Sequence, residues 1–240
     1  ASDFGGAYTG YSAYGVLARG EHANVSNSGS VLADGNYYAT GIVARSYDGT
    51  NVVTTATSEI EASALLVAIG IEARSEYGNV AVTNAGDVTV EGVYGGGVGI
   101  QAYSGLGNVT AANSGHVLAG STYGTAIGVT GYSVLGNSNV SNSGTIDAAG
   151  YYGAYGIVSQ SEFGSATAGN TSTGHIHAEA PSHAYGMFVR AYGAVTVNNA
   201  GSVSASADAG GIAAAVLMES LHGSSTLNNA STGVLGVSGT

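Results

Sequence analysis

Cysteine, tryptophan and lysine are missing from this 240-residue chain, and proline occurs only once. Without cysteine there are no disulfides and no thiolate metal sites, so packing and backbone pairing must stabilise the fold. Only Arg19, Arg45, Arg74 and Arg190 carry a full positive charge, against 15 acidic residues. A protein that holds a phosphate backbone needs a cluster of basic side chains, so nucleic acid is not an expected partner.

Long apolar runs are also missing. The longest, residues 62–71, is interrupted by Ser63 and Gly70, and it is far shorter than the roughly 20 residues of a membrane-spanning helix. No transmembrane segment is therefore expected. Glycine, by contrast, is abundant at 41 residues, and 44% of the chain is hydrophobic. This hydrophobic content is too high for a disordered chain, and the lack of proline periodicity excludes collagen, so a packed, strand-rich body is predicted.

A repeat of 28 to 30 residues explains most of the sequence. The stretch from Ile69 to Val98 contains three short runs in which apolar and polar residues alternate, separated by glycine-bearing turns. Alternation over about five residues predicts half-buried strands. Three strands and three corners make one closed rung. Eight such rungs account for residues 1–240 as a single all-β domain, a parallel β-helix.

Three columns of equivalent residues define the register of these rungs. A glycine followed by an aliphatic residue recurs at Gly15, Gly41, Gly70, Gly99, Gly128, Gly156 and Gly186, with a weaker match at Ala215. A polar column comprises Asn27, Thr55, Asn84, Asn113, Asn142, Asn170, Asn199 and Asn229. An aliphatic column comprises Val31, Ile60, Val88, Val117, Ile146, Ile176 and Val203. Because side chains on a strand alternate between its two faces, the aliphatic residues are expected to fill a narrow interior.

The asparagine column predicts a hydrogen-bonded ladder. An amide side chain has two donors and an acceptor oxygen, so stacked asparagines can bond to one another along the axis. The alternative is that each asparagine caps its own surface turn. Thr55 is expected to interrupt the ladder in the second rung. Two-residue insertions before Gly174 and Gly233 are expected to bulge this corner.

The repeat G-I-x-A-x-S-x-x-G-x-V-x-V-x-N-x-G-x-I-x-A resembles the right-handed parallel β-helix passenger regions of Gram-negative autotransporters and related haemagglutinin-like adhesins. The residues that carry it best are Gly70, Ile71, Ala73, Ser75, Gly78, Val80, Val82, Asn84, Gly86, Val88 and Val90, the last where the pattern has alanine. The resemblance implies a secreted protein at the bacterial cell surface that binds host surfaces, glycans or copies of itself. It transfers no catalytic residue, because the matching positions are core and turn positions.

Two sets of long side chains are expected on the outside of the coil. One column comprises Arg19, Arg45, Arg74, Tyr103, Tyr132, Gln160, Arg190 and Glu219. This stripe could grip a polymer along the rod, or its arginines could only pair with neighbours such as Glu72 and Glu76. The other set precedes the glycines and comprises Tyr8, Tyr11, Tyr14, Tyr37, Tyr38, Tyr94, Tyr123, Tyr151, Tyr152, Tyr155 and Tyr185. Stacking should gather these tyrosines into a ridge at one corner, which either contacts a partner or seals the coil.

Histidines are few, and one pair has the spacing of metal ligands. His175 and His177 alternate with Ile176, and Asp147 is expected beside them on the preceding rung. Two imidazoles and a carboxylate could bind a transition metal. Without a third strong ligand, ordinary polar surface is the alternative, and no metal site is predicted.

One carboxylate cluster has a conceivable chemistry. Glu59 and Glu61, beside Asp87 on the next rung, could form an acid/base pair or a calcium site, as in polysaccharide-processing enzymes that use β-helices. The sequence places no basic residue near that face to hold a uronate. We therefore predict no catalytic residue and no cofactor.

The sequence thus predicts a non-enzymatic extracellular β-helix that acts as the stalk or binding segment of a bacterial surface adhesin. Its expected partner is a glycan or protein of a host or bacterial surface, contacted through the arginine and tyrosine column and the tyrosine ridge. The first alternative is a self-assembling filament whose subunits stack end to end. The second is a polysaccharide-processing enzyme. The domain is expected to be a segment of a longer repeat array or a filament subunit.

Overall fold

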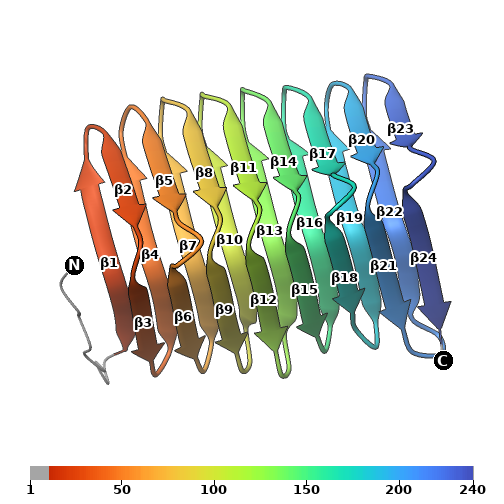
Figure 1. Cartoon of the computed structure of the whole chain (residues 1–240). Helices are drawn as coiled ribbons and strands as arrows, with labels where there is room; N and C mark the ends of the chain where they lie inside the picture. The colour runs from red at the N-terminus through yellow and green to blue at the C-terminus, as the bar shows by residue number, and fades with distance from the viewer. Residues whose placement is uncertain (1–10, 240) are drawn as a thin grey trace.

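The computed structural model, which describes residues 11–239, shows a parallel β-helix of eight rungs (Figure 1). Each rung has three strands, and equivalent strands of successive rungs pair in parallel. The predicted fold class and repeat length are confirmed. The described residues form no helix that is long and apolar enough to cross a membrane.

The three strands of a rung belong to three separate eight-stranded sheets, here named sheets A, B and C. Sheet A contains β1 (Ser12–Gly20), β4 (Tyr38–Ser46), β7 (Val67–Ser75), β10 (Gly96–Ser104), β13 (Thr125–Ser133), β16 (Gly153–Ser161), β19 (His183–Ala191) and β22 (Ile212–Ser220). Sheet B contains β2 (Ala23–Asn27), β5 (Thr50–Thr54), β8 (Val80–Asn84), β11 (Val109–Asn113), β14 (Ser138–Asn142), β17 (Ala166–Asn170), β20 (Val195–Asn199) and β23 (Ser225–Asn229). Sheet C contains β3 (Ser30–Gly35), β6 (Glu59–Ala64), β9 (Asp87–Gly92), β12 (His116–Ser121), β15 (Thr145–Gly150), β18 (His175–Glu179), β21 (Ser202–Ala207) and β24 (Val234–Gly239).

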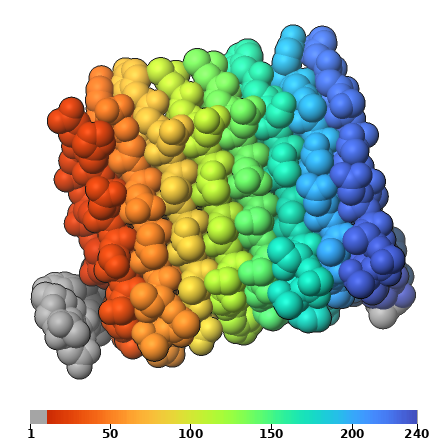
Figure 2. All heavy atoms as spheres, turned by 45° about the horizontal axis from the view of Figure 1, so that its top comes forward, coloured from red at the N-terminus to blue at the C-terminus, as the bar shows by residue number. Residues whose placement is uncertain are grey.

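Small aliphatic side chains fill the interior between the sheets. The largest buried residues are isoleucines such as Ile71, Ile100 and Ile146, none of which is exposed. The predicted aliphatic column lies in sheet C, with its members as register partners from Val31 to Val203. An isolated rung could not bury this surface, so each rung depends on its neighbours for stability. Figure 2 shows side chains of successive rungs lying in rows along the coil.

The strands of sheet A have nine residues, not the five expected, because the glycine column lies within the strand and does not end it. These glycines face sheet C at close range. A Cβ on Gly70 would lie 2.2 Å from Cγ1 of Val88 and 2.6 Å from the carbonyl oxygen of Gly99. A Cβ on Gly128 would lie 2.2 Å from Cγ2 of Ile146. In the rungs with glycine at this position, the missing side chain therefore lets sheets A and C approach closely, whereas the eighth rung has Ala215 there.

The serine in the S-x-x-G part of the repeat closes the corner between sheets A and B. In the fourth rung, Oγ of Ser104 accepts the N–H of Gly107 at 2.9 Å and donates to the carbonyl of Gly78 at 2.8 Å. Ser75 accepts the N–H of Gly78 in the same way at 3.1 Å. Each serine therefore stabilises its own turn, and Ser104 also ties that turn to the preceding rung.

The predicted asparagine ladder is confirmed between the third and eighth rungs. Side-chain amides donate to the Oδ1 of the next rung in the pairs Asn84–Asn113, Asn113–Asn142, Asn142–Asn170, Asn170–Asn199 and Asn199–Asn229, at 2.8 to 3.1 Å. Each amide also donates to the carbonyl of the glycine that follows in its own turn, as Asn84 does to Gly86. Asparagine therefore caps the turn and joins the rungs at once.

In the second rung the expected column was wrong by one residue. Asn27 pairs in register with Thr54, not with Thr55. The corner before sheet B is shorter at this end, with two residues between β1 and β2 and three between β4 and β5, against four between β7 and β8. Thr54 donates its hydroxyl to Oδ1 of Asn84, whereas the Asn27 amide donates to Gly29 of its own turn. Within residues 11–239, Asn27 is therefore a turn cap outside the ladder.

The two predicted insertions do form bulged turns, and a third was missed. The N–H of Gly174 donates to Thr171 at 2.9 Å, and that of Gly233 donates to Ala230 at 2.8 Å. The same turn follows Thr54, where the N–H of Ser58 donates to Thr55 at 3.0 Å. The shorter corner before β5 partly compensates for this third insertion. The rung therefore keeps the ordinary repeat length, and the insertion is not visible in the residue spacing.

Candidate functional site

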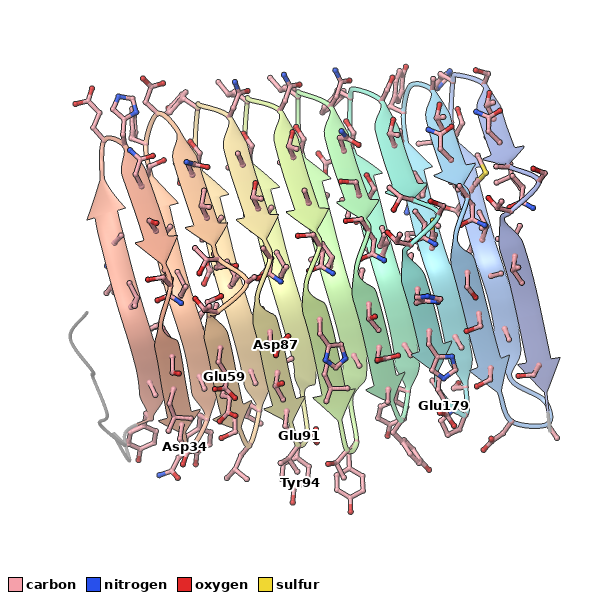
Figure 3. All side chains as sticks on the ribbon, viewed as in Figure 1. Asp34, Glu59, Asp87, Glu91, Tyr94 and Glu179 are labelled. Carbon is pink, nitrogen blue, oxygen red and sulfur yellow. The ribbon has the colours of Figure 1, made fainter. Side chains whose placement is uncertain are left out.

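The three sheets present chemically different outer faces. All four arginines lie on sheet A, together with most of the strand-borne aromatic side chains. The outer face of sheet C is acidic, with Asp34, Glu59, Glu61, Asp87, Glu91, Asp147 and Glu179 (Figure 3). The strands of sheet B contain no ionisable residue. A partner therefore meets a different surface on each side of the coil.

The predicted column of arginines and tyrosines is confirmed on the outer face of sheet A. Its members are register partners in the order Arg19, Arg45, Arg74, Tyr103, Tyr132, Gln160, Arg190 and Glu219. Part of its charge is paired, as also expected. Arg45 donates to both carboxylate oxygens of Glu72, at 3.0 and 2.9 Å, and these bonds raise the pKa of Arg45. Arg74 lies 3.8 Å from Glu76.

The centre of this column is aromatic. The rings of Tyr103 and Tyr132 stack at 5.5 Å with 9° between their planes, and the Arg74 guanidinium lies 4.6 Å above the Tyr103 ring. The Tyr132 hydroxyl donates to Glu162. Burial and this hydrogen bond together raise the pKa of Tyr132 to about 12. Because the stack and the hydrogen bond fix the rings, the column presents a rigid aromatic surface.

A second aromatic group lies beside the first on sheet A. Tyr155 and Tyr185 are register partners whose rings stack at 5.3 Å, and Phe188 meets Tyr155 edge-on at 6.1 Å. Burial raises the pKa of Tyr155. Tyr155 and Tyr185 were expected at a corner of the coil. They lie on the sheet face because the segment before each glycine belongs to the nine-residue strand.

A groove of about 430 Å³ separates the two aromatic groups. It crosses four strands, and its lining includes Val98, Gln101, Tyr103, Ile127, Thr130, Tyr132, Tyr155, Val158, Gln160 and Phe188. The central column of the groove runs from Gln101 through Thr130 and Val158 to Phe188. This site was not predicted from the sequence. The available signal was the column itself, in which the short Thr130 and Val158 lie between the longer Gln101 and Phe188 and leave a hollow.

The predicted tyrosine ridge is confirmed in part. At the corner between sheets C and A lie Tyr11, Tyr37, Tyr94, Tyr123, Tyr151 and Tyr152. Tyr11 stacks on Tyr37 at 5.2 Å, and Tyr94 on Tyr123 at 5.6 Å. Leu65 occupies the rung between these pairs. Tyr14 lies on the sheet A face and Tyr38 begins β4, whereas Tyr8 is outside the described residues.

A second exposed ridge, at the corner between sheets A and B, was not predicted. It comprises Tyr47, Tyr77, Leu106, Leu135, Phe163 and Tyr192, one from each of six successive rungs, with exposures from 41% to 61%. The Tyr47 and Tyr77 rings lie 4.5 Å apart, and those of Phe163 and Tyr192 lie 6.3 Å apart. The signal was an apolar residue one or two positions after the last residue of the sheet A strands from β4 to β19. Ridges of this kind, unusual on a monomer, are typical of contact surfaces.

The histidines of sheet C take their expected register, with Thr145 and Asp147 beside His175 and His177. They do not converge on one point. His177 Nδ1 lies 2.9 Å from the Ser204 hydroxyl, whereas Asp147 lies 3.2 Å from Nε2 of His116. No group of three or more potential metal ligands occurs within residues 11–239.

The carboxylates considered for catalysis lie on an open sheet face. Glu59 and Asp87 are register partners, and both they and Glu61 are exposed (Figure 3). None of the three lines the groove on sheet A or the hollow on sheet B. The three carboxylates therefore do not share an enclosed site with one another.

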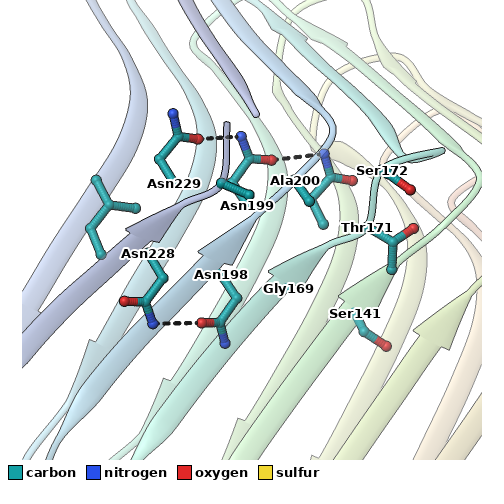
Figure 4. A pocket seen from close by; sticks show the side chains of 12 residues that line it. Ser141, Gly169, Thr171, Ser172, Asn198, Asn199, Ala200, Asn228 and Asn229 are labelled. Atoms are coloured by element: carbon teal, nitrogen blue, oxygen red, sulfur yellow. Dashed lines mark hydrogen bonds between the residues drawn. The ribbon is translucent and has the colours of Figure 1, made fainter. Parts of the chain in front are cut away.

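Sheet B has a notch at its C-terminal end (Figure 4). The outward position on β17 is Gly169, so the space between Ser141 and Asn198 is empty. The bulged turns after Asn170 and Asn229 overhang this space, and the resulting hollow is about 780 Å³. Asn228 donates to Oδ1 of Asn198 at 2.8 Å across its floor. The residues that line the notch are uncharged and include asparagines, hydroxyl residues, alanines and Leu227.

In comparisons with known proteins, no protein-family model, no curated protein and no solved structure matches the chain.

Proposed function

We propose that this β-helix is a non-enzymatic, extracellular binding segment of the adhesin type, which contacts a glycan or protein of a host or bacterial surface. The observation that supports the proposal best is the outer face of sheet A. It gathers a continuous column of arginines and tyrosines, a groove between stacked aromatic rings, and an exposed apolar ridge along each edge.

Residue chemistry favours binding on this face. Tyrosine offers a large contact area, a hydroxyl group and few rotatable bonds, and arginine can stack and donate hydrogen bonds at once, so both are enriched where proteins bind partners. Many of these rings are already fixed by stacking on the next rung, as Tyr103 is on Tyr132. Little conformational entropy is then lost on binding.

A role without catalysis is supported by the distribution of reactive groups. The carboxylates and the His175 and His177 pair lie on the exposed face of sheet C, away from the groove. The extracellular location in the proposal rests on the resemblance of the repeat to autotransporter passenger regions.

Binding of the purified protein to bacterial and host cells, and to glycan arrays, tests the proposal. The informative variants are Arg74→Ala with Tyr103→Ser on the column, and Tyr94→Ser with Tyr123→Ser on the ridge. We expect the column variant to lose about tenfold or more in affinity, as for a residue at the centre of an interface. The matched control is Thr110→Ser with Asn139→Ser on sheet B. Equal binding by all three proteins, or no binding to any surface, would contradict the proposal.

A self-assembling filament is the second candidate, supported by the outermost described rung. In β23 and β24, the last strands that the structure describes, the inward-pointing Leu227, Leu235 and Val237 are exposed. Another rung could pair with these strand edges, whether from the same chain or from another copy. Electron microscopy at high protein concentration distinguishes the candidates, since only the filament predicts end-to-end particles of varied length.

A further inference from the structure

We infer that the groove between the two aromatic groups of sheet A binds a single uncharged sugar ring, a pyranose unit of a neutral glycan. This inference rests on the proposed binding function and names its ligand class and its site. The site is the part of β10, β13, β16 and β19 around Thr130 and Val158.

The shape of the groove suits one flat ring. Thr130 and Val158 are short, branched side chains in the central column, and Gln101 and Phe188 stand at the two ends of that column. Tyr103 and Tyr132 line the groove along one neighbouring column, and Ile127 and Tyr155 along the other. Its volume of about 430 Å³ lies within the range of small-molecule sites.

The faces and the edge of a pyranose differ in polarity, and so do the residues that line the groove. Axial C–H groups make a ring face apolar, and such a face packs on aromatic and branched aliphatic side chains such as Tyr155, Phe188 and Val158. Hydroxyl groups project from the ring edge and need hydrogen-bond partners. A purely apolar groove would leave them unpaired, at a cost that is large for buried polar groups.

Those partners are present as the only two glutamines of the chain. Gln101 and Gln160 both line the groove, on neighbouring columns and two rungs apart. Neither amide makes a side-chain hydrogen bond within residues 11–239, although both are partly buried. An amide donates and accepts at once, which matches a pair of adjacent sugar hydroxyls. A purely apolar ligand would cover these amides without pairing them.

Charge selects for a neutral glycan. No aspartate, glutamate, arginine or histidine lines the groove. Glu72 and Glu162 flank it, and the chain carries a net charge of −11, so a uronate or a sulfated sugar would meet repulsion. Two arginines of the column adjoin the groove, and both lie beside a carboxylate: Arg74 stacks on Tyr103 and lies 3.8 Å from Glu76, and Arg190 lies 3.5 Å from Glu219.

The two glutamines provide a direct test. In protein labelled with ¹⁵N only at the glutamine side chains, NMR should show two amide groups, those of Gln101 and Gln160. Titration with cellotetraose, maltotetraose and mannotetraose should shift both with a common, saturable affinity for at least one sugar. Trigalacturonate, the acidic counterpart, and a tetra-alanine peptide should shift neither.

Two variants separate the site from the rest of the surface. Thr130→Phe fills the centre of the groove and should abolish the shifts, whereas Thr196→Phe, a matched change on sheet B, should leave them intact. If Thr130→Phe fails to fold, Gln101→Ala provides a second test. It should weaken sugar binding about tenfold, measured from the remaining NMR signal of the Gln160 amide. Shifts with the peptide or with trigalacturonate, or no shift with any neutral sugar, would overturn the inference. If Thr130→Phe still bound cells, the inference about the groove would be overturned, whereas the proposed adhesin function would be unaffected.

Discussion

The side-chain amide of Asn84 donates a hydrogen bond to Oδ1 of Asn113 at 2.8 Å, although 29 residues separate them in the chain. Both residues are buried, and the same bond recurs up to Asn229. The ladder matters for function because it fixes the register of neighbouring rungs. That register in turn places the arginines, tyrosines and glutamines of sheet A in columns.

Removing one member of the ladder should destabilise the coil. In Asn113→Ala, the buried Oδ1 of Asn142 and the amide of Asn84 each lose a partner, so we expect a loss of about 1–3 kcal/mol in the free energy of unfolding. Chemical denaturation followed by circular dichroism measures it. Asn139→Ala, an exposed asparagine on the outer face of sheet B, should stay within about 0.5 kcal/mol of the wild type. Equal effects of the two changes would show that the ladder does not stabilise the fold.

Adding a methyl group at the glycine column should also destabilise. The new Cβ in Gly128→Ala meets Cγ2 of Ile146 and the carbonyl of Gly156, and such overpacking costs about 1–3 kcal/mol. Gly169→Ala is the matched control, because a Cβ there has no neighbour closer than 3.9 Å. Thermal unfolding should show a lower Tm for the first variant and an equal or higher Tm for the second. A tolerated Gly128→Ala would contradict the close approach of sheets A and C.

The arginines of the column should differ in their effect on stability. Arg45 binds both oxygens of Glu72, whose side chain is only 14% exposed, whereas Arg74 and Glu76 are both about half exposed and 3.8 Å apart. We expect Arg45→Ala to cost about 1 kcal/mol and Arg74→Ala close to nothing, since exposed pairs contribute little. Denaturation at low and high salt measures both, and the Arg45 effect should shrink as salt rises. Equal losses would mean that burial of Glu72 is unimportant.

The free energy of unfolding at alkaline pH should depend on the Tyr132 hydroxyl. Its pKa of about 12 in the folded protein lies above the 10.0 of a free tyrosine, because of burial and the bond to Glu162. The unfolded state therefore loses this proton first, and the stability that depends on Tyr132 is full below pH 10 and declines as the pH rises towards 12. Tyr132→Phe should remove this part of the decline, so the free energies of unfolding of wild type and variant should converge between pH 10 and about 12. Identical pH profiles for the wild type and Tyr132→Phe would contradict the raised pKa.

Much of the fold could be predicted because every rung repeats one physical solution. The glycine, asparagine and aliphatic columns specify three strands and three corners, and the arginine and tyrosine column follows from strand alternation. Errors arose where corner length changes. The short corners before β2 and β5 and the insertion after Thr54 moved the polar column from Thr55 to Thr54.

The groove was harder to predict, because a hollow depends on side chains that are absent as much as on those that are present. Periodicity assigns Thr130 and Val158 to an outer column, but only the paired strands show Tyr132 and Tyr155 on either side of them. The ridge from Tyr47 to Tyr192 was missed for a related reason. Its members alternate between tyrosine, leucine and phenylalanine, so a search for tyrosine alone does not find them.

The stacking of residues about 29 apart, on which every surface column depends, can be tested with introduced cysteines, since the chain has none of its own. Thr110 and Asn139 are outward register partners on β11 and β14, so their Cα atoms lie about 4.8 Å apart, within reach of a disulfide. Oxidation of Thr110→Cys with Asn139→Cys should give an intramolecular disulfide in the folded monomer, detected by mass spectrometry. The pair Thr110→Cys with Thr167→Cys, two rungs apart, should remain reduced. Efficient cross-linking of the second pair, or none of the first, would contradict the layered register.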